Sequence, residues 1–217
     1  PWAMLGLLVV LAVAALGSSQ IVIRSTVSDL LESRAEDTAR GWATFIANDI
    51  PDIEAIANGS AMDAETRAEL LGFTQFGEVF RFKLFSVDGR IRLISDDLKD
   101  RVSQDGIKLG DHNAKAQAVG QSGIANTQLK DGTAKATRPD YYVESYVPIV
   151  RAGRTVAVAE VYTDQTPNVD RIVSDFRMVL AAFLFSVMLF PALGLWRQAS
   201  VLKRRNRELQ EKTIQAK

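Results

Sequence analysis

Two long uncharged stretches frame a segment of mixed polarity. Residues 1–23 and 178–196 contain no Asp, Glu, Lys or Arg and are rich in aliphatic and aromatic side chains. About 20 apolar residues cross a bilayer core as a helix. The pattern therefore predicts transmembrane helices at 1–23 and 178–196, with one domain at 24–177 between them. The alternative for the first stretch is a cleaved signal peptide, because AVAALG resembles a cleavage region.

Apolar positions after the first span keep a helical period. They recur at intervals of three and four residues through Val27–Ile53, as on one face of an amphipathic helix. This spacing predicts a long helix that leaves the membrane as a stalk and is ended by Pro51 and Asn58-Gly59-Ser60. A short second helix is expected at Ala61–Leu71.

The polarity pattern changes to a period of two from Glu78. Glu78–Ser86 alternates, which places Phe80, Phe82 and Leu84 on one face of a strand. Arg90–Ser95 alternates again, and Asp88-Gly89 between them favours a hairpin turn. Further elements are expected as a helix at Asp111–Val119 capped by Asp111, and as strands at Ile124–Leu129, Tyr141–Val150 and Thr155–Thr163. Pro148 indicates an edge position or a bulge. The predicted fold class is α+β, an antiparallel sheet of about five strands with the long helix on one face.

Charge is distributed unevenly along a chain whose formal net charge is zero. The tail at 197–217 carries seven basic and two acidic residues, whereas residues 24–177 carry 19 basic and 24 acidic ones. The positive-inside rule places the tail in the cytoplasm and residues 24–177 outside, in the periplasm of a bacterial inner membrane. A nucleic-acid binder is disfavoured because there is no basic excess. The absence of Cys excludes a disulfide framework.

The tail at 197–217 lacks Pro and Gly, which predicts a juxtamembrane helix. Leu195, Leu202 and Leu209 recur every seven residues, as at the start of a parallel coiled coil. A solvated helix whose basic residues face anionic membrane lipid is the other interpretation.

No motif for a nucleophile, a metal or a cofactor is present, so no catalytic site, metal or cofactor is predicted. Candidate ligand-binding residues come from the strand faces. Arg81 and Lys83 share one side of a strand and Arg92 lies on its hairpin partner, and like charges so placed suit an anion such as a carboxylate. A second set, Tyr142, Glu144 and Tyr146, shares a face typical of a small-molecule pocket, and His112 is a further candidate.

Two segments resemble a known family. FRFKLFSVDGRIRLISDD (Phe80–Asp97) and YYVESYVPIVRAGRTVAVAEVYTD (Tyr141–Asp164) are similar to hairpins of bacterial transmembrane sensors with a PAS-like Cache (PDC) domain, although Ala157 replaces a Gly of the second motif. The resemblance implies a homodimer, a small extracytoplasmic ligand and a cytoplasmic output module. Such modules are histidine kinases of two-component systems, diguanylate cyclases, cyclic-di-GMP phosphodiesterases or chemoreceptor domains, and none lies in this chain.

The predicted function is therefore transmembrane signal sensing. A membrane-anchored docking or assembly module without a small-molecule ligand is the alternative. An enzyme acting within residues 24–177 is a third class, which the lack of an acid–base or nucleophile set disfavours.

Overall fold

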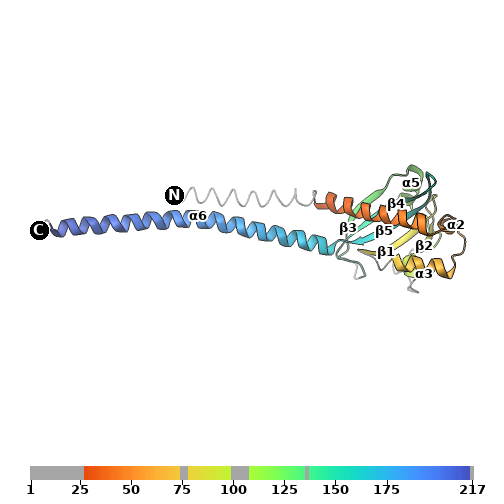
Figure 1. The fold of residues 1–217 in the computed structure, drawn as a ribbon, viewed down its shortest axis with the longest axis horizontal. Coiled ribbons are helices and arrows are strands. Elements are labelled where there is room, and N and C mark those ends of the chain that lie inside the picture. Colours follow the sequence, from red (N-terminus) through yellow and green to blue (C-terminus); the bar gives the residue numbers. More distant parts are fainter. Residues whose placement is uncertain (1–26, 74–77, 99–107, 135–136, 216–217) are drawn as a thin grey trace. The chain divides into compact units, whose positions relative to one another are not determined.

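The computed structural model describes residues 27–73, 78–98, 108–134 and 137–215. The chain divides into two units, Pro1–Thr166 and Pro167–Lys217, and each is described by itself. The first unit is a sheet with helices on both faces (Figure 1). The transmembrane helix expected at 1–23 lies outside the described residues.

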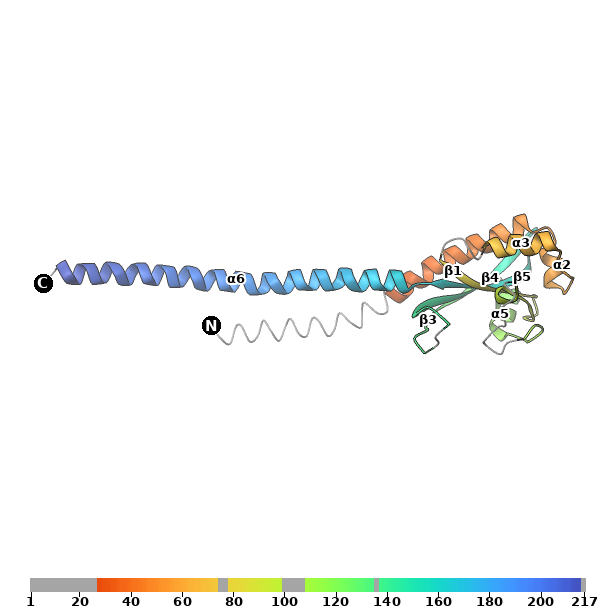
Figure 2. The same cartoon turned by 90° about the horizontal axis from the view of Figure 1, so that it is seen from below.

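A helix at residues 27–49 lies along one face of the sheet (Figure 2). Its buried side chains are mostly small, and they repeat every three or four residues: Leu31, Ala35, Ala39, Ala43, Ile46 and Ala47. Alanines at these positions let the helix backbone approach the sheet closely. The predicted period and the end of the helix before Pro51 are confirmed, whereas the link from this helix to the membrane falls on residues that are not described.

Two further helices follow on the same side of the sheet. Helix α2 (Ile53–Ala57) contributes Ile53 and Ile56 to the helix-side core, and α3 (Ala64–Phe73) overlaps the predicted second helix. The guanidinium of Arg151 holds the end of the 27–49 helix. Its Nε donates to Ala47 O at 2.7 Å and its Nη2 to Ile50 O at 2.6 Å, and Nη1 donates to Pro51 O. Ala47 O belongs to the last turn of the helix, whose carbonyls have no N–H donor within the helix, and Ile50 O and Pro51 O follow directly after it.

The sheet has five antiparallel strands in the order β2-β1-β5-β4-β3. Their bounds are β1 Val79–Phe85, β2 Ile91–Ile94, β3 Asn126–Asp131, β4 Tyr141–Arg151 and β5 Arg154–Asp164. The α+β class and both predicted hairpins are confirmed. Pro148 lies past Tyr146, where the pairing with β3 stops, so this proline without an N–H occupies an edge of the sheet, as expected.

A bulge in β1 overturns the simple alternation expected there. The register shifts between Val79 and Arg81. As a result Val79 joins Phe82 in the helix-side core, and the ring of Phe80 turns to the opposite face, 6.0 Å from the ring of Tyr162. The prediction that Phe80 shares a face with Phe82 is therefore wrong, because the extra residue in the strand reverses the sidedness of its neighbours.

The second face of the sheet carries α5 (Ala114–Ser122) over a smaller apolar cluster. The N-cap of α5 is Asn113, whose Oδ1 accepts from Lys115 N and Ala116 N at 3.0 Å. The predicted cap, Asp111, instead accepts from Lys108 N in the preceding turn. The backbone explains the shift, because Asn113 N donates to Gly89 O of the β1–β2 turn and the helix starts only after this contact.

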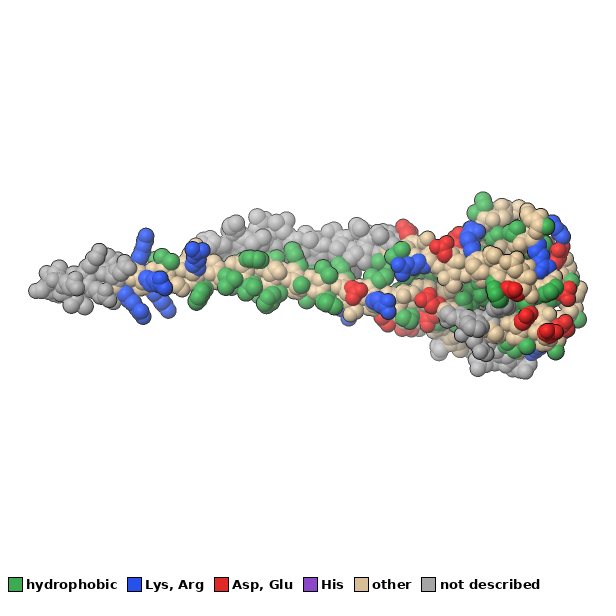
Figure 3. Space-filling model, viewed as in Figure 1, with side chains coloured by type: hydrophobic (Ala, Val, Ile, Leu, Met, Phe, Trp, Pro, Cys, Tyr) green, Lys and Arg blue, Asp and Glu red, His purple; other side chains and the backbone are tan. Residues whose placement is uncertain are grey.

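The second unit is a single helix, α6, which begins at Thr166 and ends at Gln215. Among the described residues one helix, Thr166–Arg207, is long and apolar enough to cross a membrane. It contains the predicted span at 178–196, with Pro191 inside the helix. Hydrophobic side chains cover its middle and basic side chains its C-terminal part (Figure 3). Strand β5 ends at Asp164, and Pro167 lies in the first turn of α6, where proline is tolerated.

Candidate functional site

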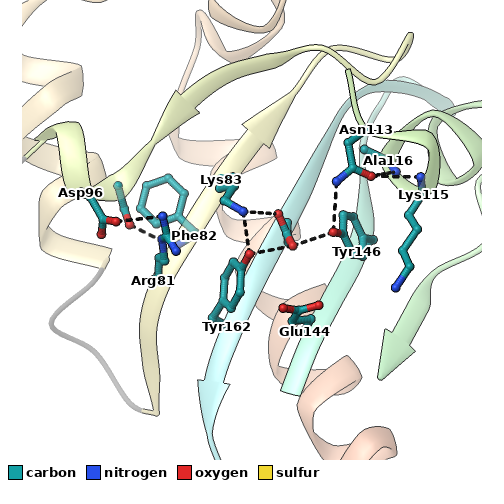
Figure 4. Close-up of polar contacts among 12 residues, drawn as sticks. Arg81, Phe82, Lys83, Asp96, Asn113, Lys115, Ala116, Glu144, Tyr146 and Tyr162 are labelled. Carbon is teal, nitrogen blue, oxygen red and sulfur yellow. Dashed lines mark hydrogen bonds and ion pairs between the residues drawn. The ribbon is translucent and has the colours of Figure 1, made fainter. Parts of the chain in front are cut away.

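Polar side chains of three adjacent strands gather on the sheet face opposite the 27–49 helix. Residues paired across antiparallel strands lie on the same face. Strand β5 runs between β1 and β4, so Glu160 faces both Lys83 and Tyr146. One step along the strands, Tyr162 faces both Arg81 and Glu144. Figure 4 shows Lys83, Tyr146 and Tyr162 directed toward one another, and Arg81 directed toward Asp96.

Lys83 and Glu160 form a buried ion pair at the centre of this face. Lys83 Nζ lies 3.1 Å from Glu160 Oε2 and donates to Tyr162 Oη at 2.6 Å. The other carboxylate oxygen, Oε1, accepts from Tyr146 Oη at 2.6 Å and from Tyr162 Oη at 2.8 Å. The four side chains are almost fully buried, so the charge of Lys83 is balanced within the protein and shielded from water.

The two phenols of this network stay protonated. Burial raises the pKa of Tyr146 and of Tyr162 well above the ordinary value, and the charge of Glu160 raises both further. Tyr146 Oη also accepts from Asn113 Nδ2 at 3.2 Å. The N-cap of α5 is therefore hydrogen-bonded to the central network.

Arg81 forms a second ion pair on the same face. Its Nη2 lies 2.9 Å from Asp96 Oδ2, on the short helix α4 (Ser95–Leu98), and its Cζ lies 5.5 Å from the centroid of the Tyr162 ring. The like charges of Arg81 and Lys83, which predicted an anion between them, are thus each matched by a carboxylate of the chain.

A third ion pair joins Arg138 to Glu144 at 3.4 Å. Arg138 also donates to Tyr142 Oη, and its Cζ lies 5.0 Å from the Tyr142 ring and 5.6 Å from the Tyr162 ring. Sequence analysis did not find Arg138, because it precedes β4 in an irregular segment without periodicity. The ring of Tyr162 thus lies within 6 Å of three cationic groups.

The structure brings together five of the seven predicted site residues: Arg81, Lys83, Tyr142, Glu144 and Tyr146. Arg92 lies elsewhere, against the turn after α2, where a Cβ on Gly59 would be 3.4 Å from Arg92 Nη1. His112 is exposed, in an isolated bridge with Arg90. Glu160 and Tyr162 were missed, although a carboxylate inside the apolar run of β5 was a usable signal.

The described residues contain no group of three or more His, Asp or Glu side chains suited to holding a metal ion. The site therefore offers hydrogen bonds, ion pairs and aromatic surfaces. Among the described residues, three of its cations are each paired with a carboxylate.

No protein-family model matches the chain, and no curated protein matches it. The solved structures similar to it include the sensor domain of the V. cholerae histidine kinase DctB, with 15% identity, a TM-score of 0.34 and coverage of 71% of this chain and 54% of that one. They also include the A. aeolicus nlh2 GAF domain in an inactive state, with 14% identity, a TM-score of 0.35 and coverage of 67% and 96%. The chain thus spans about half the length of the DctB structure. At these scores neither similarity identifies the fold or the function of this chain.

Proposed function

We propose that residues 24–177 are an extracytoplasmic PAS-like Cache sensor domain whose polar sheet face binds a small molecule carrying a carboxylate. One observation carries the proposal: three ion pairs and the ring of Tyr162 are concentrated on β1, β5, β4 and their flanks, where an apolar core would be more stable. Buried ion pairs contribute little net stability compared with well-packed apolar side chains. Their concentration on one face therefore favours a recognition role.

The membrane arrangement belongs to the same proposal. Spans at 1–23 and 178–196 would place the domain in the bacterial periplasm and the tail at 197–217 in the cytoplasm, ahead of an output module. The chain has no Cys, so single-cysteine variants test this arrangement directly. Gln121 and Gln198 are exposed helical residues of the domain and the tail. In intact bacterial cells a membrane-impermeant maleimide should label the Gln121→Cys variant. It should label the Gln198→Cys variant only after the cells are permeabilised. The reverse pattern would show that the chain has the opposite topology.

Ligand binding would reach the membrane through the 27–49 helix. Two carboxylates of this helix hold the edge strand β3: Leu129 N donates to Glu32 Oε1 at 2.9 Å, and Thr127 Oγ1 donates to Glu36 Oε2 at 3.1 Å. A shift of β3 against β4 would therefore pull on this helix. A ligand can bias the receptor only by its differential affinity for the two arrangements.

A thermal-shift screen of the full chain in lipid nanodiscs against organic acids and amino acids tests ligand binding. At least one compound should raise the melting temperature, and Arg81→Gln should abolish the rise. The matched control is Arg40→Gln, which removes an exposed arginine paired with Glu36 on the 27–49 helix and should leave the rise intact. If the two substitutions reduce the rise in melting temperature equally, the polar sheet face is not where the compound binds.

A docking or assembly module is the second candidate function. Leu30 and Phe45 of the 27–49 helix are 46% and 49% exposed, on the side turned away from the sheet. Apolar side chains so exposed also suit the homodimer expected of such receptors. Sedimentation of the chain in detergent, with and without Phe45→Ser, tests this face of the helix. Loss of a dimer together with unchanged ligand binding would assign dimerisation to the 27–49 helix and ligand binding to the polar sheet face.

A further inference from the structure

We infer that a basic face of α6, past the predicted span at 178–196, binds the phosphate headgroups of anionic lipid in the leaflet beside the tail. This inference rests on the membrane arrangement of the proposed function. It goes beyond that function, because it gives the tail a binding partner of its own, whatever ligand the sheet receives.

The cationic side chains after the apolar stretch gather on one side of the helix. Five of them, all exposed, lie between positions 197 and 207: Arg197, Lys203, Arg204, Arg205 and Arg207. Successive residues of an α-helix are about 100° apart around its axis, so all except Arg205 fall within an arc of about 120°. Leu202, the middle residue of the heptad repeat, lies on the opposite side. A coiled-coil partner at Leu202 would therefore leave the basic face free.

The helix itself does not balance the charge of this face. No Asp or Glu occurs from position 176 to position 207, and none lies within four residues of Arg197 or Lys203. Ion pairs along a helix need an opposite charge three or four residues away. The first turns of α6 carry acidic and basic residues in equal number: Asp170, Asp175, Arg171 and Arg177. An anionic surface therefore suits the C-terminal end of the predicted span and not its beginning.

The direction of the chain turns the basic side chains toward the bilayer. The Cα–Cβ bonds of a helix tilt toward its N-terminus, and here the predicted span lies on that side. Trp196, 71% exposed, ends the apolar stretch, where an indole suits the headgroup region. At about 1.5 Å per residue, Lys203 and Arg207 lie about 10 and 16 Å further along the helix. The headgroup layer takes up about 5–8 Å of this distance, so the basic face begins within about one Debye length of the phosphates.

Anionic phospholipid matches this face chemically. A guanidinium donates two parallel hydrogen bonds to phosphate oxygens, and the ammonium of Lys203 adds a point charge. Phosphatidylcholine offers the same phosphate with a cationic choline attached, which the basic face repels. Each cation near an anionic surface strengthens binding about fivefold, so several together select lipid of net negative charge.

Native mass spectrometry of the full chain in neutral detergent tests this preference. Phosphatidylglycerol and phosphatidylcholine with identical acyl chains are added in equal amounts, and the ratio of the two bound lipids is measured. We expect phosphatidylglycerol to be retained at least about tenfold over phosphatidylcholine. Inorganic phosphate at ten times the lipid concentration and constant ionic strength should leave the ratio unchanged. Displacement of the lipid by phosphate would show that a soluble anion suffices, and would overturn a membrane partner.

Two triple variants with equal loss of charge locate the binding. Lys203→Gln, Arg204→Gln and Arg207→Gln together should lower the ratio below about twofold, and glutamine preserves the helix. The control combines Arg40→Gln, Arg90→Gln and Arg154→Gln, which removes three arginines of the first unit whose side chains are 46%, 55% and 67% exposed. It should keep the ratio of the unchanged chain. Equal losses in the two variants would overturn the inference.

A bilayer measurement complements the mass spectrometry. Because the chain has no Cys, Asn206→Cys gives a single position for an environment-sensitive fluorophore beside the basic face. Its emission should lie at shorter wavelength in nanodiscs with about 30% phosphatidylglycerol than in pure phosphatidylcholine, and the tail variant should abolish the difference. Equal emission in both nanodiscs would overturn the inference. Ligand sensing would be unaffected, because the thermal-shift screen tests it separately, and the maleimide labels test the topology.

Discussion

Replacing Lys83 by Met tests the central ion pair. The substitution keeps the length of the side chain but leaves Glu160, 2% exposed, without the ammonium 3.1 Å away. Removing one partner of a buried pair costs about 3–5 kcal/mol. Two phenol hydrogen bonds to Glu160 remain, so we expect a loss near the lower end, about 3 kcal/mol of the free energy of unfolding. Combining Lys83→Met with Glu160→Gln removes both charges and should recover about 2 kcal/mol of that loss.

Urea unfolding in detergent measures these free energies. Trp42 packs 4.7 Å from Phe82 in the helix-side core and reports on the domain alone once Trp2 and Trp196 are replaced by Phe. Arg40→Met, at an exposed pair within one helix, is the control and should cost no more than about 0.5 kcal/mol. A loss below about 1 kcal/mol for Lys83→Met, or strictly additive effects in the double variant, would refute the reasoning from burial.

Other parts of the domain yield three further predictions. Arg151→Met leaves the end of the 27–49 helix without three guanidinium hydrogen bonds and should lower the free energy of unfolding by about 2–4 kcal/mol in urea titrations; a loss no larger than for Arg40→Met would contradict this. Burial raises the pKa of Tyr162, so its contribution is present below about pH 10 and is lost as the pH rises above it. Tyr162→Phe should therefore flatten the alkaline fall of stability by up to about 1.4 kcal/mol per pH unit, and an unchanged slope would show that the phenol ionises freely. Gly120→Ala places a Cβ 2.4 Å from Val87 O and should lower the melting temperature, whereas Gly41→Ala, with open space around it, should raise it; equal shifts would count against the packing of α5 on the β1–β2 turn.

Local patterns predicted the elements well, because a helical or strand period depends only on which side of its own segment is buried. The alternation within single strands also placed Arg81 with Lys83, and Tyr142 with Glu144 and Tyr146. What it could not supply was the strand order. Only because β5 runs between β1 and β4 does Glu160 lie between Lys83 and Tyr146, and no pattern within one strand contains that information.

Two errors came from contacts between distant segments. The bulge that reverses Phe80 is a property of the β1–β5 pairing, so the sequence of β1 gives no sign of it. Asp111 and Asn113 are both good N-cap residues, and the hydrogen bond from Asn113 N to Gly89 O selects the second. The positions of both membrane spans, the homodimer and the output module stay predictions.

Fluorine NMR of tyrosine tests the central claim, that the polar sheet face receives the ligand, most directly. The chain has four tyrosines, of which Tyr142, Tyr146 and Tyr162 lie on that face, while Tyr141 alternates to the other side of β4. The full chain labelled with 3-fluorotyrosine should give four signals that single Tyr→Phe substitutions assign. A compound that raises the melting temperature should shift the signals of Tyr142 and Tyr162 and leave that of Tyr141 in place. A shift confined to Tyr141, or no shift in any tyrosine at saturating compound, would contradict the claim.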